Sequence, residues 1–151
     1  GRAGGVRQEE VRRLDEKVER QVVRILQLLF DGKISDAERA LENLEKRVKG
    51  TELNGYATAI RGILISYTTD DKTSMLYRVY SSDDPKGELQ QYVRAMREAD
   101  ASFDDSKSPV VEVWEAVLRN FDRLPVPHKF RSSQEVKQQT LDEEGAESGK
   151  G

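Results

Sequence analysis

Three aspartate pairs are the first candidates for chemistry in this chain of 151 residues, and they stand at Asp70-Asp71, Asp83-Asp84 and Asp104-Asp105. Paired carboxylates can bind Mg²⁺ or Ca²⁺, but none of the pairs lies in the acidic, glycine-centred loop of an EF-hand. Each pair precedes an expected helix start, where aspartate accepts backbone N–H groups and complements the helix dipole. We therefore expect helix caps at these positions rather than a metal site.

The only histidine, His128, lies in a proline-rich stretch beside Lys129. A metal site or a catalytic triad at His128 would require partners brought from elsewhere in the chain. We therefore expect a solvated linker residue. The chain has no cysteine, which excludes thiolate nucleophiles, disulfides and cysteine-based zinc or iron–sulfur sites. These residues predict no catalytic residue, no metal ligand and no cofactor.

Two glycines, Gly55 and Gly62, lie seven residues apart in a run whose apolar residues otherwise have helical spacing. Each costs a helix interior about 1 kcal/mol relative to alanine. Phosphate-binding loops instead cluster their glycines in a turn after a strand. With Ala59 between them, the glycines put small residues on one side of a helix. We predict a groove at Gly55, Ala59 and Gly62 that a neighbouring helix, the first or the second, approaches closely. Entry of a ligand or partner is the alternative.

Apolar spacings of three and four residues predict the helices that carry these groups. A first helix over 8–30 ends at Gly32, and a second begins at the capping-box pattern of Ser35 and Glu38 and ends at Gly50. Thr51 is expected to cap a third helix. Three amphipathic helices joined by short links favour an antiparallel bundle.

Weaker patterns follow the third helix. The stretch 73–82 has both helix and strand formers, and we favour a helix because one isolated strand would have no partner. Asp84-Pro85 and Ser108-Pro109 each predict a helix start with proline at the first helical position. Trp114 falls on a face that we expect to be buried.

The fold prediction is therefore all-α, a single antiparallel helical bundle of five or six helices with a disordered C-terminal tail. The length suits one domain. We expect a flexible N-terminus over 1–7, a helical domain over 8–123, and a linker and disordered tail over 124–151. The tail is polar, ends in glycine and has no apolar stripe; a weak helix over 134–141 is the alternative.

The first helix has an apolar stripe wider than one partner helix normally covers. We interpret this stripe as a partner seam, formed by Val11, Val18, Val22, Ile25, Leu26 and Leu29. In the absence of a catalytic constellation, the seam predicts a non-enzymatic protein–protein interaction module, with a homodimer as one version. A metal-dependent hydrolase that uses one aspartate pair is the third hypothesis.

The second hypothesis is an RNA- or ribosome-associated factor. The net charge of −3 weakens the case for a general nucleic-acid binder. Nevertheless, Arg7, Arg12 and Arg13 form a candidate phosphate-binding end of the first helix. The later cations of that helix, such as Arg20 and Arg24, alternate with acids, which is typical of a solvated face with intrahelical ion pairs.

No apolar run approaches the ~18 residues that span a membrane, and no signal-peptide core is visible, so we expect a cytoplasmic protein. The span 32–64 reads GKISDAERALENLEKRVKGTELNGYATAIRGIL. Its glycine-led capped helix, Gly-x-Glu link and later Gly-Tyr and Ala-x-x-Gly resemble a segment of small, uncharacterised helical archaeal proteins. That resemblance covers about a fifth of the chain and implies an archaeal origin and no particular activity.

Overall fold

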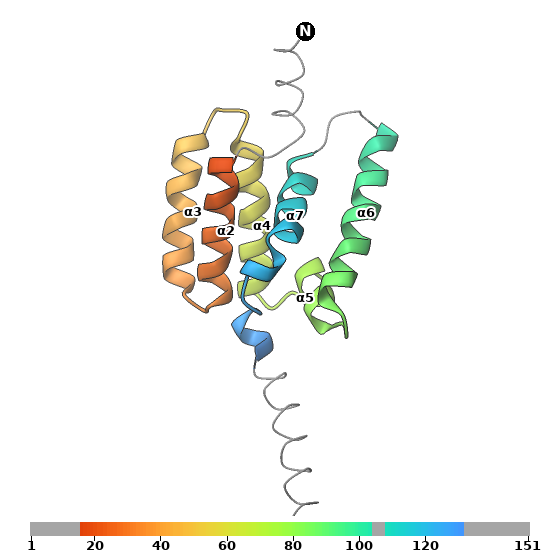
Figure 1. Ribbon diagram of the computed structural model, residues 1–151. Coiled ribbons are helices and arrows are strands. Elements are labelled where there is room, and N and C mark those ends of the chain that lie inside the picture. The colour runs from red at the N-terminus through yellow and green to blue at the C-terminus, as the bar shows by residue number, and fades with distance from the viewer. Residues whose placement is uncertain (1–15, 104–107, 132–151) are drawn as a thin grey trace, which may run out of the picture.

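The computed structural model describes residues 16–103 and 108–131, and over these residues the protein is an all-α bundle (Figure 1). The prediction of an all-α fold is therefore confirmed. The expected tail over 132–151, its alternative helix over 134–141 and the flexible start over 1–7 lie outside the described residues. The described helices are α2 (Glu16–Phe30), α3 (Ile34–Val48), α4 (Asn54–Thr68), α5 (Met75–Ser81), α6 (Pro85–Phe103), α7 (Pro109–Arg119) and a 3₁₀ turn, η1 (Phe121–Arg123).

Helix α7 holds the centre of this arrangement. Helices α2, α3 and α4 follow one another as antiparallel neighbours, and α7 packs against α2, α4 and α6 (Figure 1). The short α5 joins the end of α4 to α6 and contacts both. The core accordingly draws on every one of these helices, from Val22 and Leu26 on α2 to Val113 on α7.

Glycines end the first two helices as predicted. Gly32 and Gly50 have φ values of +81° and +76°, the left-handed conformation that glycine adopts without a Cβ penalty. At the end of α2, the Gly32 N–H donates to the Leu29 carbonyl at 3.1 Å and the Lys33 N–H donates to the Leu28 carbonyl at 2.9 Å. Two carbonyls at the end of the helix therefore gain backbone partners.

Serine and aspartate begin the later helices. The hydroxyls of Ser74 and Ser108 accept from the backbone N–H groups three residues on, so the helix expected within 73–82 and the start at Ser108-Pro109 are both confirmed. At the start of α6, an Asp84 carboxylate oxygen accepts from the Gly87 N–H at 3.2 Å. These are the side-chain caps that satisfy otherwise unpaired N–H groups.

Two expected caps are wrong. Ser35 is exposed within the first turn of α3, whose N-cap is Lys33 and has no side-chain cap. Thr51 precedes α4 by three residues, and its hydroxyl instead donates to the Val48 carbonyl at 2.6 Å and accepts from the Leu53 N–H at 3.1 Å. Thr51 therefore stabilises the link between α3 and α4 rather than the start of α4.

The packed unit continues beyond residue 123, where we expected a linker to begin. Leu124 is buried, and Val126 and Phe130 pack against the core. Phe130 also makes ring contacts with Tyr77 and Tyr80 at centroid distances of 4.9 and 5.7 Å. The segment 124–131 therefore belongs to the helical domain.

The predicted small-residue groove on α4 has two different halves. A Cβ atom built on Gly55 would lie 2.6 Å from the Pro109 ring, so α7 approaches this glycine closely. The neighbour is therefore α7, and not the first or second helix as we expected. At Gly62 no described atom lies within 4 Å of such a Cβ, so this end of the groove is open.

Replacing each glycine with alanine is expected to change stability in opposite directions. Gly55→Ala should lower the free energy of unfolding by about 1–3 kcal/mol, because the new methyl group overpacks against Pro109. Gly62→Ala should raise it by up to about 1 kcal/mol through helix propensity alone. Urea denaturation of both variants measures the difference. Equal changes in the two variants would contradict the close approach at Gly55.

Candidate functional site

The predicted partner seam on the first helix is buried inside the chain's own core. Its described members have exposed fractions of 0–6%, and they are Val18, Val22, Ile25, Leu26 and Leu29. The stripe is wide because α2 packs against both α3 and α7. The interpretation of these residues as a surface for another chain is therefore wrong, and Val11 lies outside the described residues.

An open apolar groove lies instead between α4, α5 and α7. It has a volume of about 600 Å³. The α4 wall consists of Gly55, Thr58, Ala59, Gly62, Ile63 and Ser66. The remaining wall consists of Ser74, Met75 and Leu76 from α5 and Pro109, Val110 and Trp114 from α7. We call this feature the α4–α7 groove; it contains all three residues of the predicted small-residue groove.

The α4–α7 groove has small residues along α4, and large apolar side chains near it are exposed to solvent. Val110, on its rim, and Ile65, one residue before Ser66, are 47% and 50% exposed. They are the large hydrophobic residues that the described part of the chain leaves exposed. Gly62 adds no side chain to the α4 wall of the groove, and no described atom lies within 4 Å of a Cβ atom built there. The groove therefore offers uncovered apolar surface at one place.

Among the described residues, none of the side chains that line the α4–α7 groove is titratable, and their hydroxyls are engaged locally. Thr58 and Ser66 donate to backbone carbonyls of α4 at 3.2 and 2.9 Å, and Ser74 accepts from Tyr77 N–H as the cap of α5. General acid–base catalysis requires a positioned titratable group. The groove is therefore built for apolar contact.

A polar cluster ties the segment after η1 to the end of α4. The Tyr67 hydroxyl lies 2.6 Å from His128 Nδ1, and Lys129 Nζ donates to an Asp70 carboxylate oxygen at 2.6 Å. The Tyr77 hydroxyl donates to the same oxygen at 2.5 Å. His128 is therefore a half-buried structural residue, which corrects the expectation of a solvated linker position.

The pKa values in this cluster follow from these bonds. The hydrogen bonds from Lys129, and then from Tyr77, lower the pKa of the Asp70 carboxyl below its usual value. Burial, helped by the nearby Asp70 carboxylate, raises the pKa of Tyr77 to about 12. The phenol therefore stays protonated and the carboxylate stays charged near neutral pH, which preserves this contact.

The aspartate pairs serve mainly as local hydrogen-bond acceptors. Asp71 accepts from the Thr73 N–H at 3.0 Å and from its hydroxyl at 2.6 Å, and Asp84 caps α6 as described above. Asp104 and Asp105 lie outside the described residues. Across residues 16–103 and 108–131, no group of three histidine, aspartate or glutamate side chains is arranged to hold a metal ion.

The first helix has an ion pair with another helix that the expected intrahelical pattern did not include. Glu19 pairs with Arg119 of α7 at 2.5 Å, whereas Arg20 and Arg24 are exposed beside α3. In the sequence, the only sign of these basic side chains beside α3 is the helical spacing of Lys17, Arg20 and Arg24. The predicted phosphate contacts Arg7, Arg12 and Arg13 lie outside the described residues, so that prediction stays untested.

Comparisons with protein-family models, curated proteins and solved structures find no match to this chain. The resemblance of residues 32–64 to archaeal proteins therefore stays a prediction. Among the helices of the described ranges, none combines the length and apolar character needed to cross a membrane.

Replacing Asp70 with asparagine is expected to remove a pH-dependent part of the stability. Because the pKa of Asp70 is lowered in the folded state, its contribution is present above the unfolded value and is lost as the pH falls through the folded value. Asparagine also tolerates the positive φ of this position, which is +56°. Asp70→Asn should therefore melt below the wild type at pH 7, and the difference should shrink as the pH falls below the pKa of an unfolded aspartate.

Thermal melts across this pH range provide the measurement, and Asp83→Asn is the matched control. Asp83 is an exposed carboxylate with no hydrogen bond or ion pair within the described part of the chain. Its variant should follow the wild type at every pH. A constant difference between Asp70→Asn and the wild type at all pH values would rule out the proposed role of the charge.

Proposed function

We propose that this chain is a non-enzymatic helical interaction module that self-associates by docking the α4–α7 grooves of two copies. One observation carries the proposal: Val110, one of the two exposed large hydrophobics of the described chain, lines an open groove whose floor includes Gly62, and the other, Ile65, lies on the same helix as Gly62, three residues further on. A surface of this kind excludes water most favourably when another apolar surface covers it.

A second copy of the chain suits this surface because each copy has both exposed apolar side chains and an open apolar groove that can receive them. In a twofold dimer the same patch meets itself, so Ile65 or Val110 of one copy can enter the space above Gly62 of the other. The lining residues that the structure describes bear no charge, so two copies can approach without burying like charges from them. Small residues at 59 and 62 also permit a close approach of a helix.

Val110→Asp is expected to convert the self-associating protein into a monomer. The carboxylate places a charge on each copy within the proposed contact, where desolvation and like-charge repulsion oppose docking. Position 110 is exposed and lies in the first turn of α7, where an acidic residue complements the helix dipole, so the fold should persist. Sedimentation equilibrium over a concentration series measures the change.

Gln91→Asp is the control, since Gln91 is exposed on α6 and is absent from the groove lining. It should dimerise like the wild type, with a dissociation constant in the micromolar range. Gly62→Leu should keep the fold and weaken association by filling the floor of the groove. A wild-type protein that stays monomeric at ~100 µM would contradict self-association.

A further inference from the structure

A second groove, between α2 and α3, is basic. It has a volume of about 260 Å³, and the side chains that line it are Lys17, Arg20, Gln21, Arg24 and Ile25 from α2 and Ala40, Leu44 and Arg47 from α3. Four of these eight residues are cationic and none is acidic. We call this feature the α2–α3 groove; it has no lining residue in common with the α4–α7 groove.

The arginines of the α2–α3 groove are not paired with acidic side chains of the described chain, whereas several arginines elsewhere in the fold are. Arg61 pairs with both Glu38 and Glu45, and Arg119 pairs with Glu19. These pairs direct three acids of α2 and α3 towards α4 and α7. Within the described residues, by contrast, the exposed side chains of Arg20, Arg24 and Arg47 form no hydrogen bond or ion pair.

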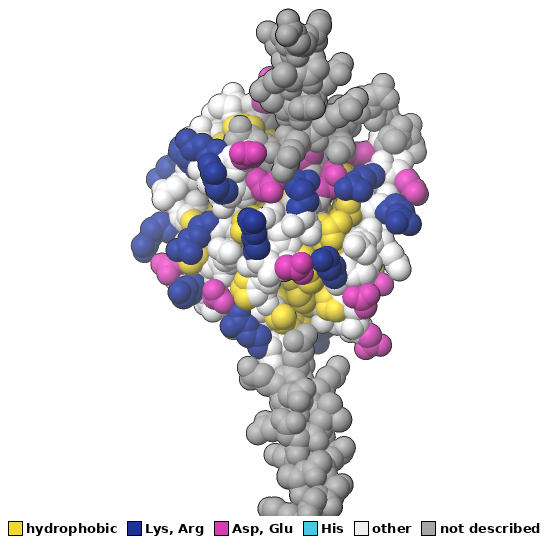
Figure 2. Space-filling view, viewed as in Figure 1, with side chains coloured by type: hydrophobic (Ala, Val, Ile, Leu, Met, Phe, Trp, Pro, Cys, Tyr) yellow, Lys and Arg dark blue, Asp and Glu magenta, His cyan; other side chains and the backbone are white. Residues whose placement is uncertain are grey.

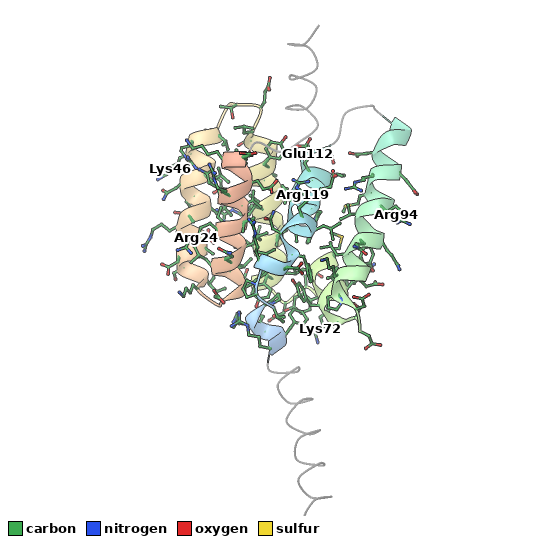
Figure 3. The ribbon with its side chains drawn as sticks, viewed as in Figure 1. Arg24, Lys46, Lys72, Arg94, Glu112 and Arg119 are labelled. Carbon is green, nitrogen blue, oxygen red and sulfur yellow. The ribbon has the colours of Figure 1, made fainter. Side chains whose placement is uncertain are left out.

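The surface around the groove is mostly positive, although exposed acids such as Glu16, Asp36 and Glu42 also lie on these two helices. Figure 2 shows Lys and Arg side chains gathered over α3 and α2, with few acidic side chains among them. In Figure 3, Arg24 and Lys46 lie on this side of the molecule, whereas Arg94 lies on the distant α6. A chain with a net charge of −3 thus concentrates exposed positive charge on one pair of helices.

We propose that the α2–α3 groove binds single-stranded nucleic acid through its phosphates. Guanidinium groups present a planar fork of donors that matches phosphate oxygens, and arginine supplies three of the four cations here. Lys17 and Arg24 are seven residues apart, about 10 Å along the helix axis, so the ligand must carry several charges along its length. A nucleic-acid backbone meets that requirement.

The floor of the groove favours a nucleic acid over an acidic peptide. Ile25, Ala40 and Leu44 form an apolar floor between the cations, and the half-buried Ala40 is its accessible part, because Ile25 and Leu44 are each only 2% exposed. A base can lie against such a surface while its neighbouring phosphates reach the arginines; single-strand-binding grooves also combine a basic track with a surface for the bases, although aromatic side chains usually form that surface. A volume of about 260 Å³ accommodates a flat base more readily than a helix with its side chains. This site is separate from the proposed dimer surface.

Fluorescence anisotropy with a labelled, mixed-sequence single-stranded RNA of ~12 nucleotides tests the proposal. Three or four phosphate contacts predict a slope of log K against log salt concentration of about −2 to −3. We expect a dissociation constant on the order of 10 µM at low salt. Arg20→Gln combined with Arg24→Gln should weaken binding at least about tenfold. Arg47→Gln, on the other helix, should weaken it independently.

The matched control is Arg78→Gln combined with Arg94→Gln. Both positions are exposed, on α5 and α6, and this double variant removes the same net charge. It should bind RNA like the wild type, and melting curves of both double variants should match the wild type because all four residues are exposed.

Three outcomes would overturn the proposal. One is no binding of the RNA by the wild-type protein at about 50 mM salt. Another is equal weakening by the two double variants, which would show a diffuse charge effect. The last is equal affinity for polyglutamate of similar length, which would make the groove a site for acidic polypeptides. None of these results depends on the oligomeric state, so they leave the proposal for the α4–α7 groove unaffected.

Discussion

The burial of α7 between α2, α4 and α6 is the constraint on which the rest of the structure depends. The helix buries the side chains of Val113 and Ala116 completely. It also buries Glu112 and Glu115, and the oxygens of these two carboxylates need hydrogen bonds within the fold. The Tyr56 hydroxyl of α4 donates to Glu112, and the guanidinium of Arg97 on α6 donates to Glu115 at 2.7 and 3.0 Å. Burial, with the adjacent Glu112, raises the pKa of Tyr56, so the phenol keeps the proton that it donates. These contacts fix α7 to α4 and α6 by polar bonds as well as by packing.

The same position of α7 determines where surface remains open. Because α7 crosses α4 with Pro109 against Gly55, one end of the small-residue face of α4 is covered and the other, at Gly62, is not. Because α7 also covers the apolar stripe of α2, that stripe has no surface to offer another chain. Arg119 of α7 draws Glu19 towards itself, while Arg61 of α4 holds two acids of α3. The arginines on the remaining side of α2 and α3 are consequently left to solvent.

Much of the fold could be predicted from the sequence because the relevant interactions are local. Apolar spacing, the glycine helix ends at 32 and 50, and the Ser108-Pro109 start all act within a few residues, and each predicted its element correctly. The candidate sites depended on contacts between distant segments. Periodicity shows that a face of α2 is apolar, but not which helix covers it. Likewise, the pairing of Tyr67 with His128 joins residues 61 apart, and no local pattern predicts it. A local pattern can also fail: the capping box at Ser35 predicted the wrong start, because the helix begins two residues earlier, with Lys33 at the N-cap.

The two grooves have different linings, so a dimer formed through the α4–α7 grooves leaves both α2–α3 grooves open. A strand long enough to reach both grooves would bind the second one intramolecularly, at a raised effective concentration.

Lengthening the RNA from ~12 to ~40 nucleotides should therefore tighten its binding to the wild-type protein. The gain in affinity should be well above the gain expected only because a longer strand offers more binding positions. Val110→Asp should bind the short strand normally and lose this extra gain, because a monomer offers one groove. Anisotropy titrations of both proteins with both strands measure this. If the longer RNA increased the affinity of the wild type and of Val110→Asp equally, the two grooves would act separately, even if each binds RNA as proposed.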